Sequence, residues 1–449
     1  MHEFAARDRE ALASVSEWIA ERLTSPPEAP SPRHIHGETV LPDLTREGVG
    51  PQAAWASLRD SVLPTSFPSD HARYLAFVGG APTPTAVLAD AALSAASVYG
   101  GSELEAGAVV AVERAAMAWL CGLLGYPEGA HGTFVSGGSM ANLSALVAAR
   151  HGRTSASGGP PSTIVVGASA HSSVHSAATI MGCAVVLAGT AHGVLRAHDL
   201  EPVLAALDPA DVVAVVASAG ATNTGAIDAL TEIAECCATR GIWLHVDAAY
   251  GGAAMLAPAY RERFAGIDRA DSITIDPHKW LFTPFDCAAV IYRDPALARA
   301  AHRQHAHYLD VVNDDGADNP ADYAVHLTRR ARGVPLWASL LAYGTDAYVD
   351  AVERCLAMAA YAAKQIEADP TLELALDPQL SVVLFRRIGW DADDYARWSH
   401  QIRLRGLGLV TPSTFAGRPV LRLCFVNPRT THADVGILLE SLAHADSAW

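Results

Sequence analysis

The chain has 449 residues, with 32 Lys and Arg against 48 Asp and Glu, so its formal net charge is −16. A surface this negative repels phosphate backbones, so we expect no nucleic-acid partner. No apolar run approaches the roughly 20 residues of a membrane span, and Met1–Glu10 lacks the apolar core of a secretion signal, so we expect no membrane segment. The seven cysteines form no CxxC pair, which predicts neither a disulfide framework nor a metal site. A cytoplasmic protein with a large core remains, most simply an enzyme.

Residues 1–83 predict a helix followed by an extended arm. The arm, Ser25–Gly50, is rich in Pro and poor in periodic apolar residues. It cannot form a core alone, so we expect this N-terminal segment to pack on the main body or on a second subunit. The helix is predicted at Arg9–Leu23, with one apolar face made of Leu12, Val15, Ile19 and Leu23.

Residues 84–336 predict a large α/β domain. Short Val-, Ile- and Ala-rich runs alternate here with helical segments such as Leu200–Leu207 and Ala229–Arg240. Strands of this kind are buried on both faces, which indicates a mostly parallel sheet covered by helices. The predicted strands are Thr163–Gly167, Cys183–Ala188, Val212–Ala217, Ile242–Ala248 and Ala288–Tyr292.

Residues 337–449 predict a smaller C-terminal α/β domain. A long helix to about Ile366 leads into two strand-like runs, Ser381–Arg386 and Val420–Phe425. Before this unit, the polar stretch His302–Asp322 interrupts the alternating pattern, and we interpret it as a lid over a site.

The motif Asp276–Trp280 (DPHKW) follows another strand-like run, Ser272–Ile275. Burial at a strand end disfavours an ammonium, so we expect it to lower the pKa of Lys279. Only a neutral amine attacks a carbonyl, so Lys279 is a candidate for covalent binding of a carbonyl cofactor. A lysine taken alone is more often a surface residue, and two further motifs decide between these interpretations.

The second motif, Trp243–Gly251 (WLHVDAAYG), is an apolar strand with Asp247 at its end. A strand-end aspartate often caps the next helix. A buried carboxylate can instead stabilise a cationic ring nitrogen such as that of pyridoxal phosphate (PLP), whose protonation makes this cofactor an electron acceptor.

The third motif, Val135–Leu143 (VSGGSMANL), places a Gly-Gly-Ser turn before the helical segment Met140–Arg150. Backbone N–H groups and a hydroxyl at a helix N-terminus form an anion site, although such a turn alone is most often ordinary. Turn, Asp247 and Lys279 follow one another on one α/β region, and the two charged residues are 32 positions apart.

In these motifs the sequence resembles the group II PLP-dependent amino-acid decarboxylases, the family of aromatic-L-amino-acid decarboxylase. The resemblance covers about His71–Thr431 and is strongest in His245–Tyr250 and Pro277–Cys287 (PHKWLFTPFDC). It implies PLP as cofactor and the PLP-dependent transferase fold type I (aspartate aminotransferase-like). That fold is α/β, with a mostly parallel sheet in the large domain and a small C-terminal domain.

The resemblance implies four catalytic residues. Lys279 would bind PLP covalently, and Asp247 would bind the ring nitrogen. His171, in the motif ASAHSS, would stack on the ring. Tyr308, in the motif HAHYLD on the polar stretch, would return a proton to the substrate Cα after CO2 leaves. A loop tyrosine is otherwise an anchoring aromatic, so this role rests on the resemblance.

Further cofactor contacts follow from the same resemblance. Thr222, in the motif GATNTG, and Ala249 would lie against the ring, although a turn hydroxyl such as that of Thr222 equally often satisfies local backbone groups. Asp276 stands where some family members carry Asn beside the phosphate, and its carboxylate would repel an anion, so we assign it no phosphate contact. The phosphate would be held by Gly138, Ser139 and His278.

Phe77, Tyr99 and Gly101 fall where the family lines its side-chain pocket. An aromatic and uncharged lining suits an aromatic or bulky apolar L-amino acid, although Phe77 is equally a candidate core residue. An acidic amino acid would need a cation, for which Arg73 is the nearby candidate. Acidic amino-acid decarboxylation therefore stays open.

Two further alternatives remain. One is a PLP-dependent aldehyde synthase, and the other is a PLP-binding protein without turnover. The family resemblance also implies a homodimer whose active sites lie at the subunit interface, which suits the N-terminal arm. For Arg329, Arg330 and Arg332 (TRRARG) we expect structural ion pairs.

Overall fold

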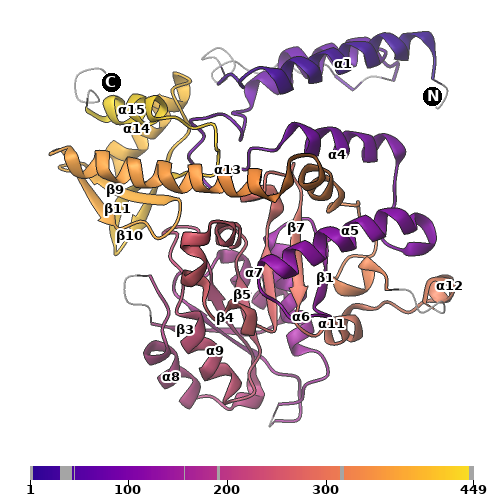
Figure 1. Ribbon diagram of the computed structural model, residues 1–449, viewed down its shortest axis with the longest axis vertical. Coiled ribbons are helices and arrows are strands. Elements are labelled where there is room, and N and C mark those ends of the chain that lie inside the picture. Colours follow the sequence, from indigo (N-terminus) through magenta and orange to yellow (C-terminus); the bar gives the residue numbers. More distant parts are fainter. Residues whose placement is uncertain are drawn as a thin grey trace.

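The computed structural model describes residues 4–30, 43–44, 46–155, 157–189, 193–313 and 318–443. Figure 1 shows a large sheet with helices on both sides, a smaller sheet beside it, and the long helix α13 passing along both. The N-terminal helix α1 lies at one end of the molecule, away from the large sheet.

The large sheet has the strand order β1-β7-β6-β5-β4-β2-β3. Neighbouring strands from β3 to β6 run parallel, and β7 is antiparallel to both β6 and β1. The mostly parallel α/β sheet predicted from the sequence is therefore confirmed. Its strands are β1 (His131–Val135), β2 (Thr163–Gly167), β3 (Ala184–Ala188), β4 (Val212–Ser218), β5 (Leu244–Asp247), β6 (Ser272–Ile275) and β7 (Ala288–Tyr292).

The apolar strand sequences are explained by helices on both faces of the sheet. All residues of β4 are buried, with Val215 and Ala217 in one core cluster and Ala214 and Val216 in another. On one face lie α6 (Gly138–Arg150), α7 (Ser172–Met181) and α11 (Pro295–His302), and on the other lie α5 (Glu103–Leu123), α8 (Ala197–Ala205) and α9 (Leu230–Ala238).

The register aligns the carboxyl ends of the parallel strands at one edge. Ser218 at the end of β4 pairs with Asp247 at the end of β5, and Asp247 pairs with Thr274 near the end of β6. Loops after neighbouring parallel strands emerge on the same side, where ligands bind in open α/β sheets. The sheet thus gathers loops that are far apart in the sequence.

Helix α5 is the one described helix with the length and apolarity of a membrane span. It packs on β1 and α13, and its middle turn carries Glu113. The Glu113 carboxylate accepts two hydrogen bonds from Arg329, at 2.6 and 2.9 Å, and a third from the Gly333 N–H at 2.8 Å. Both charged side chains are almost fully buried. Core packing therefore accounts for the apolar face of α5.

The second sheet is antiparallel, in the order β10-β11-β9-β8, and is covered by α14 (Ala392–Leu404) and α15 (His432–Ala443). The predicted boundary at 336/337 falls inside α13 (Val334–Ala368), which packs on elements of both units. The strands are β8 (Leu372–Leu376), β9 (Val382–Arg387), β10 (Thr411–Phe415) and β11 (Arg418–Cys424).

The N-terminal helix α1 (Ala6–Thr24) packs on α3 (Pro51–Ser57) through an edge-to-face contact of Trp18 and Trp55, with ring centroids 5.6 Å apart. Of the predicted apolar face of α1, three residues are half-buried while Leu12 is exposed. Half of the predicted arm, residues 31–42 and 45, lies outside the described residues.

The buried Glu113–Arg329 pair yields a stability prediction. Glu113→Gln leaves the Arg329 guanidinium buried without its counter-ion, so the free energy of unfolding should fall by about 3–5 kcal/mol. Urea unfolding followed by circular dichroism measures the loss. The matched control, Asp60→Asn, removes the exposed Arg59–Asp60 pair and should leave the unfolding midpoint unchanged. Equal midpoints for the two variants would contradict the prediction.

Candidate active site

A cavity of about 260 Å³ lies at the carboxyl edge of the large sheet. It is lined by the loops that follow β1, β2, β4, β5 and β6, together with the first turns of α6 and α7. We call it the first cavity. Its lining includes all eight residues for which the sequence predicts a cofactor contact: Gly138, Ser139, His171, Thr222, Asp247, Ala249, His278 and Lys279.

Lys279 lies in the short helix α10 (Pro277–Trp280), which begins directly after the loop residue Asp276. Its Nζ is 2.9 Å from Asp276 Oδ2. Burial lowers the pKa of Lys279, but the carboxylates of Asp276 and Asp247 outweigh burial, so the pKa lies above its usual value. The sequence-based expectation of a lowered pKa is wrong for the ligand-free site, because the carboxylates stabilise the ammonium more than burial destabilises it.

Asp276 is almost completely buried, and its Oδ1 has no hydrogen-bond partner among the described residues. The same carboxylate limits the turn before α6, since a Cβ added at Gly138 would lie 2.9 Å from Asp276 Oδ2. A side chain at position 138 would therefore collide with Asp276. Glycine keeps the start of α6 open to the cavity, and the free N–H groups of a first helical turn attract an anion there.

Asp247 ends β5 with its carboxylate in the first cavity. Its Oδ2 accepts a hydrogen bond from Asn142 Nδ2 at 2.9 Å, and its Oδ1 accepts one from the Ala249 N–H at 3.1 Å. These two donors hold the Asp247 carboxylate in one orientation. His171 lies at the start of α7, where its Nδ1 is 2.8 Å from Ser173 Oγ.

The first cavity thus offers a distinct group for each part of a compact polar ligand. Asp247 suits a cationic nitrogen, the amino group of Lys279 suits a carbonyl carbon, and the N-terminus of α6 with Ser139 suits an anion. Ser169 lines the same cavity, and its buried hydroxyl has no partner among the described residues, so it is a further donor available to a ligand. Burial lowers the pKa of His278, which keeps its ring neutral.

A second cavity of about 710 Å³ adjoins the first and shares Ser169, His171 and Thr222 with it. Phe77 lines the second cavity, with a positive φ of 51° and its side chain 59% exposed. The sequence left two interpretations of Phe77, a residue beside a substrate cavity or a core residue. Because its side chain is exposed, Phe77 is not a core residue.

Arg422, on β11, is the one cationic side chain among the described residues that line the second cavity. It is buried, and it donates hydrogen bonds to the carbonyls of Thr222 at 2.9 Å and Phe77 at 2.6 Å. Its Nη2 has no partner among the described residues. A buried guanidinium with a spare donor suits a carboxylate.

Tyr99 and Gly101 line neither of these two cavities within this chain. The Tyr99 hydroxyl donates a hydrogen bond to the Leu327 carbonyl at 3.0 Å, and a Cβ added at Gly101 would lie 2.3 Å from the Tyr99 ring. Burial, then the neighbouring Glu105 and Tyr308, raise the pKa of Tyr99. Tyr308 is therefore close enough to Tyr99 to affect it electrostatically, and neither Tyr99, Gly101 nor Tyr308 lines the cofactor cavity of the same chain.

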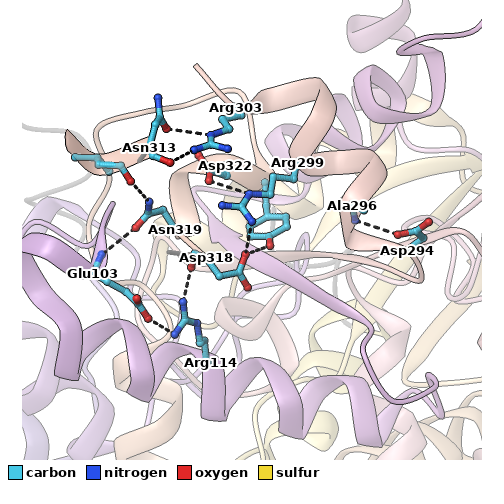
Figure 2. A network of polar contacts seen from close by, with 12 residues as sticks. Glu103, Arg114, Asp294, Ala296, Arg299, Arg303, Asn313, Asp318, Asn319 and Asp322 are labelled. Atoms are coloured by element: carbon cyan, nitrogen blue, oxygen red, sulfur yellow. Dashed lines mark hydrogen bonds and ion pairs between the residues drawn. The ribbon is translucent and has the colours of Figure 1, made fainter. Parts of the chain in front are cut away.

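Tyr308 lies in the short helix η7 (His307–Leu309) and is 72% exposed. Figure 2 shows the polar contacts that anchor the ends of this predicted lid on α5 and α11. The Asn319 side chain accepts a hydrogen bond from the Glu103 N–H at 3.0 Å, Arg299 lies 3.3 Å from Asp322, and Arg303 donates to Asn313 at 3.1 Å. Residues 314–317 of the lid lie outside the described residues.

The arginines singled out in the sequence are all in ion pairs. Arg329, Arg330 and Arg332 pair with Glu113, Asp90 and Asp286 respectively, as expected. Arg73 lies 2.8 Å from Asp434 and does not line the second cavity, so this candidate cation for an acidic substrate is already neutralised.

Sequence reasoning missed Asn142, Ser173 and Arg422. Arg422 interrupts the apolar run VLRLCFV, which was an available signal for a buried charge with a special role. Asn142 and Ser173 lie within motifs already recognised, but nothing local shows that their side chains meet. No group of three or more side chains arranged to hold a metal ion occurs in the described part of the chain.

Comparison with known proteins gives the same family at several levels. The family model "Pyridoxal-dependent decarboxylase conserved domain" matches residues 67–388. Aromatic-L-amino-acid decarboxylase of Bacillus atrophaeus is 30% identical over 81% of this chain and 78% of its own length. L-2,4-Diaminobutyrate decarboxylase of Rhizobium meliloti (strain 1021) is 31% identical over 90% of this chain and 83% of its own length.

Solved structures share the fold at lower identity. Mouse CSAD superposes with a TM-score of 0.88 at 23% identity, covering 99% of this chain and 100% of its own. Oryza sativa TDC, solved with PLP and tryptamine, superposes with a TM-score of 0.85 at 22% identity, covering 99% of each chain.

The contact between Asp276 and Lys279 yields a prediction on the lysine pKa. Asp276→Asn removes the nearest carboxylate, so the pKa of Lys279 should fall, and its reaction with amine reagents should reach half-maximum at a lower pH. The chain contains two lysines, so the measurement uses a Lys364→Ala background and reductive methylation of the ligand-free protein, followed at Lys279 by mass spectrometry. Asp377→Asn, an exposed control, should leave the midpoint unchanged. A midpoint that stays constant or rises in Asp276→Asn would show that this carboxylate does not stabilise the ammonium.

Proposed function

The chain belongs to the pyridoxal-dependent decarboxylase family, and on that premise we propose that it decarboxylates an aromatic or bulky apolar L-amino acid to the amine and CO2. Its class as a PLP-dependent carboxy-lyase follows from the family. The residue roles, the substrate and the assembly are our proposals. One observation carries them: the eight predicted cofactor residues meet in a single cavity, and Asp247 and Lys279 supply its opposite charges.

The residues of the first cavity fit PLP. Lys279 would bind the aldehyde carbon, Asp247 the protonated ring nitrogen, and Gly138, Ser139 and His278 the phosphate. The orphan hydroxyl of Ser169 gives the cofactor one more donor. When bound, PLP accepts the electron pair that the departing carboxylate leaves behind.

The chain's own residues then orient the substrate and handle the proton. His171 and Ala249, which both line the first cavity, are proposed to pack against the cofactor, and Thr222 lines both cavities. Orientation selects the bond to the carboxylate for cleavage, because only a bond aligned with the π system breaks readily. Tyr308 Oη is proposed to return a proton to the substrate Cα.

The second cavity supports a substrate with an uncharged side chain. Arg422 is proposed to bind the substrate carboxylate, and it is the one cation in the described lining. No acidic side chain occurs in that lining to pair with the second amino group of a diamino acid. Phe77 and Phe415 add aromatic surface. Arg73, the cation considered for an acidic substrate, is paired with Asp434.

We further propose a homodimer in which each chain completes the site of its partner. Support comes from Tyr99, Gly101 and Tyr308, which lie outside the cofactor cavity of their own chain. Exposed apolar side chains on packed helices, Leu88 on α4 (Pro84–Ala96) and Leu341 on α13, supply surface for such a contact. A cytoplasmic location is also proposed, on the grounds that all seven cysteines are free.

The proposed activity is tested by measuring amine and CO2 release over the twenty amino acids, dihydroxyphenylalanine and 2,4-diaminobutyrate. Lys279→Ala should abolish release and the PLP adduct that borohydride traps, because no other lysine reaches the cavity. Lys364→Ala removes the other lysine, which is exposed on α13, and should retain both. Preference for an acidic or diamino substrate would overturn the proposed specificity, and trapping in Lys279→Ala would overturn the role of Lys279.

Tyr308→Phe should change the product. The aromatic ring remains, so CO2 release should continue, but without the hydroxyl no proton reaches Cα promptly and oxygen can react there. Under air, aldehyde, ammonia and peroxide should replace much of the amine, with one O2 and one water consumed per aldehyde formed. Oxygen uptake and product analysis measure the change. Wild-type amine formation without oxygen uptake would show that Tyr308 only packs.

Mixing Tyr308→Phe chains with Lys279→Ala chains tests whether Tyr308 acts in the active site of the partner subunit. In a mixed dimer, one site would combine Lys279 of one chain with Tyr308 of the other, so amine formation should return to about a quarter of the wild-type level. Unmixed Lys279→Ala should remain inactive. If mixing restores no amine formation, Tyr308 does not act across subunits.

A further inference from the structure

The carboxamide of Asn142, on the second turn of α6, uses every hydrogen-bond position it has. Its Nδ2 donates to Asp247 Oδ2 and to Ser173 Oγ, both at 2.9 Å. Its Oδ1 accepts from Thr274 Oγ1 at 2.7 Å and from His245 Nε2 at 3.0 Å. A primary amide has two donors and two acceptor positions, so none is left for solvent or ligand. No polar atom of Asn142 is therefore free to bind a ligand in the cofactor site.

The groups at the two ends of this hydrogen-bond network determine which group donates and which accepts along it. At one end the indole of Trp243, which can only donate, binds Ser272 Oγ at 2.8 Å. Ser272 then donates to His245 Nδ1 at 2.8 Å, which leaves the ring proton on Nε2 to bind Asn142 Oδ1. At the other end the carboxylate of Asp247 can only accept. Only one amide orientation and one His245 tautomer satisfy both ends.

A second branch runs from the same amide to His171. Because Ser173 Oγ accepts from Asn142 Nδ2, its own proton is free to bind His171 Nδ1 at 2.8 Å. The Ser173 N–H points to the same ring nitrogen at 3.2 Å. His171 Nδ1 is thus an acceptor, from the Ser173 N–H and from the Ser173 hydroxyl. Asn142 therefore bonds Asp247 directly and contributes to the orientation of His171 through Ser173.

Burial keeps the network in this state. His245, Ser272 and Thr274 are fully buried, and Asn142 is 1% exposed. Burial lowers the pKa of His245 to about 4, against the opposing effect of Asp247, so His245 stays neutral and can accept from Ser272. Polar groups this deep are costly unless every one is paired, and removing one partner leaves the others unsatisfied.

We propose that Asn142 is the positioning residue of this active site, orienting the Asp247 carboxylate toward a cationic ring nitrogen and, through Ser173, supporting the orientation of the His171 ring. This rests on the proposed function. A carboxylate held by directed donors is oriented for a cationic partner before that partner binds. Asn142 lines the first cavity, but its amide has no free donor or acceptor, so it acts through its neighbours.

The test compares Asn142→Asp with Asn427→Asp. Each change keeps the size of a buried asparagine and its acceptor oxygen, but Asn427 bonds the Asp70 carbonyl and the Arg429 N–H, away from the site. The dissociation constant of PLP, titrated into apoprotein, should rise by about tenfold or more in Asn142→Asp, the loss of one charge-assisted hydrogen bond, and stay within about twofold in Asn427→Asp. The absorbance of the PLP-loaded protein should also shift its pH midpoint in Asn142→Asp alone, while kcat falls more than KM.

A pair of His245 variants keeps the proposal testable if Asn142→Asp does not fold. His245→Gln can still accept from Ser272 and donate to Asn142, so PLP affinity and the pH midpoint should remain near wild type. His245→Leu ends the directional chain and should reproduce the effect of Asn142→Asp. Equal behaviour of the two His245 variants, or unchanged PLP affinity and pH midpoint in Asn142→Asp, would overturn the proposal. If wild-type protein binds PLP but releases no amine, the proposed function fails, while the affinity comparison still decides this inference.

Discussion

Two carboxylates and one ammonium share a cavity with little solvent, and this charge balance governs the rest of the site. Asp276 and Asp247 together outweigh the burial of Lys279 and keep its amine protonated in the ligand-free chain. The lysine must lose that proton before it can attack a carbonyl. Once Asp247 is paired with a cation, it no longer stabilises the ammonium, so the pKa of Lys279 falls. Binding of a cationic cofactor at Asp247 therefore also favours the neutral amine of Lys279, because the same carboxylate interacts electrostatically with both groups.

The parallel sheet makes this balance possible because it brings distant loops to one edge. Ser218, Asp247 and Thr274 lie side by side in register although they come from three separate strands. The N-terminus of α6, which suits an anion, faces the same edge, whereas Asp247 suits a cation. A ligand with an anion at one end and a cationic nitrogen at the other therefore fits in one orientation, which the backbone determines before any side chain moves.

The sequence predicted this edge well, because each of its groups belongs to a local motif. Buried strands such as β2 and β4 are continuous apolar runs, whereas β1 contains Gly132 and β10 alternates weakly, so neither strand stood out. The raised pKa of Lys279 escaped prediction because local burial was counted without Asp276, three residues before it. The four partners of Asn142 come from two strands, β5 and β6, and from helix α7. Such an arrangement is invisible until tertiary contacts place those elements together.

The absence of Tyr99, Gly101 and Tyr308 from the linings of both cavities has a consequence for the proposed mechanism. The proposed cofactor groups come from the sheet edge of one chain, whereas these three residues lie outside that cavity. If the proposed partner supplies this second set, PLP can bind a single folded chain, but proton return at Cα requires the assembled pair. In the proposed dimer, decarboxylation and its outcome, amine or aldehyde, would then depend on different parts of the structure. Release of CO2 would depend on the sheet edge, and the product would depend on the lid proposed to come from the partner.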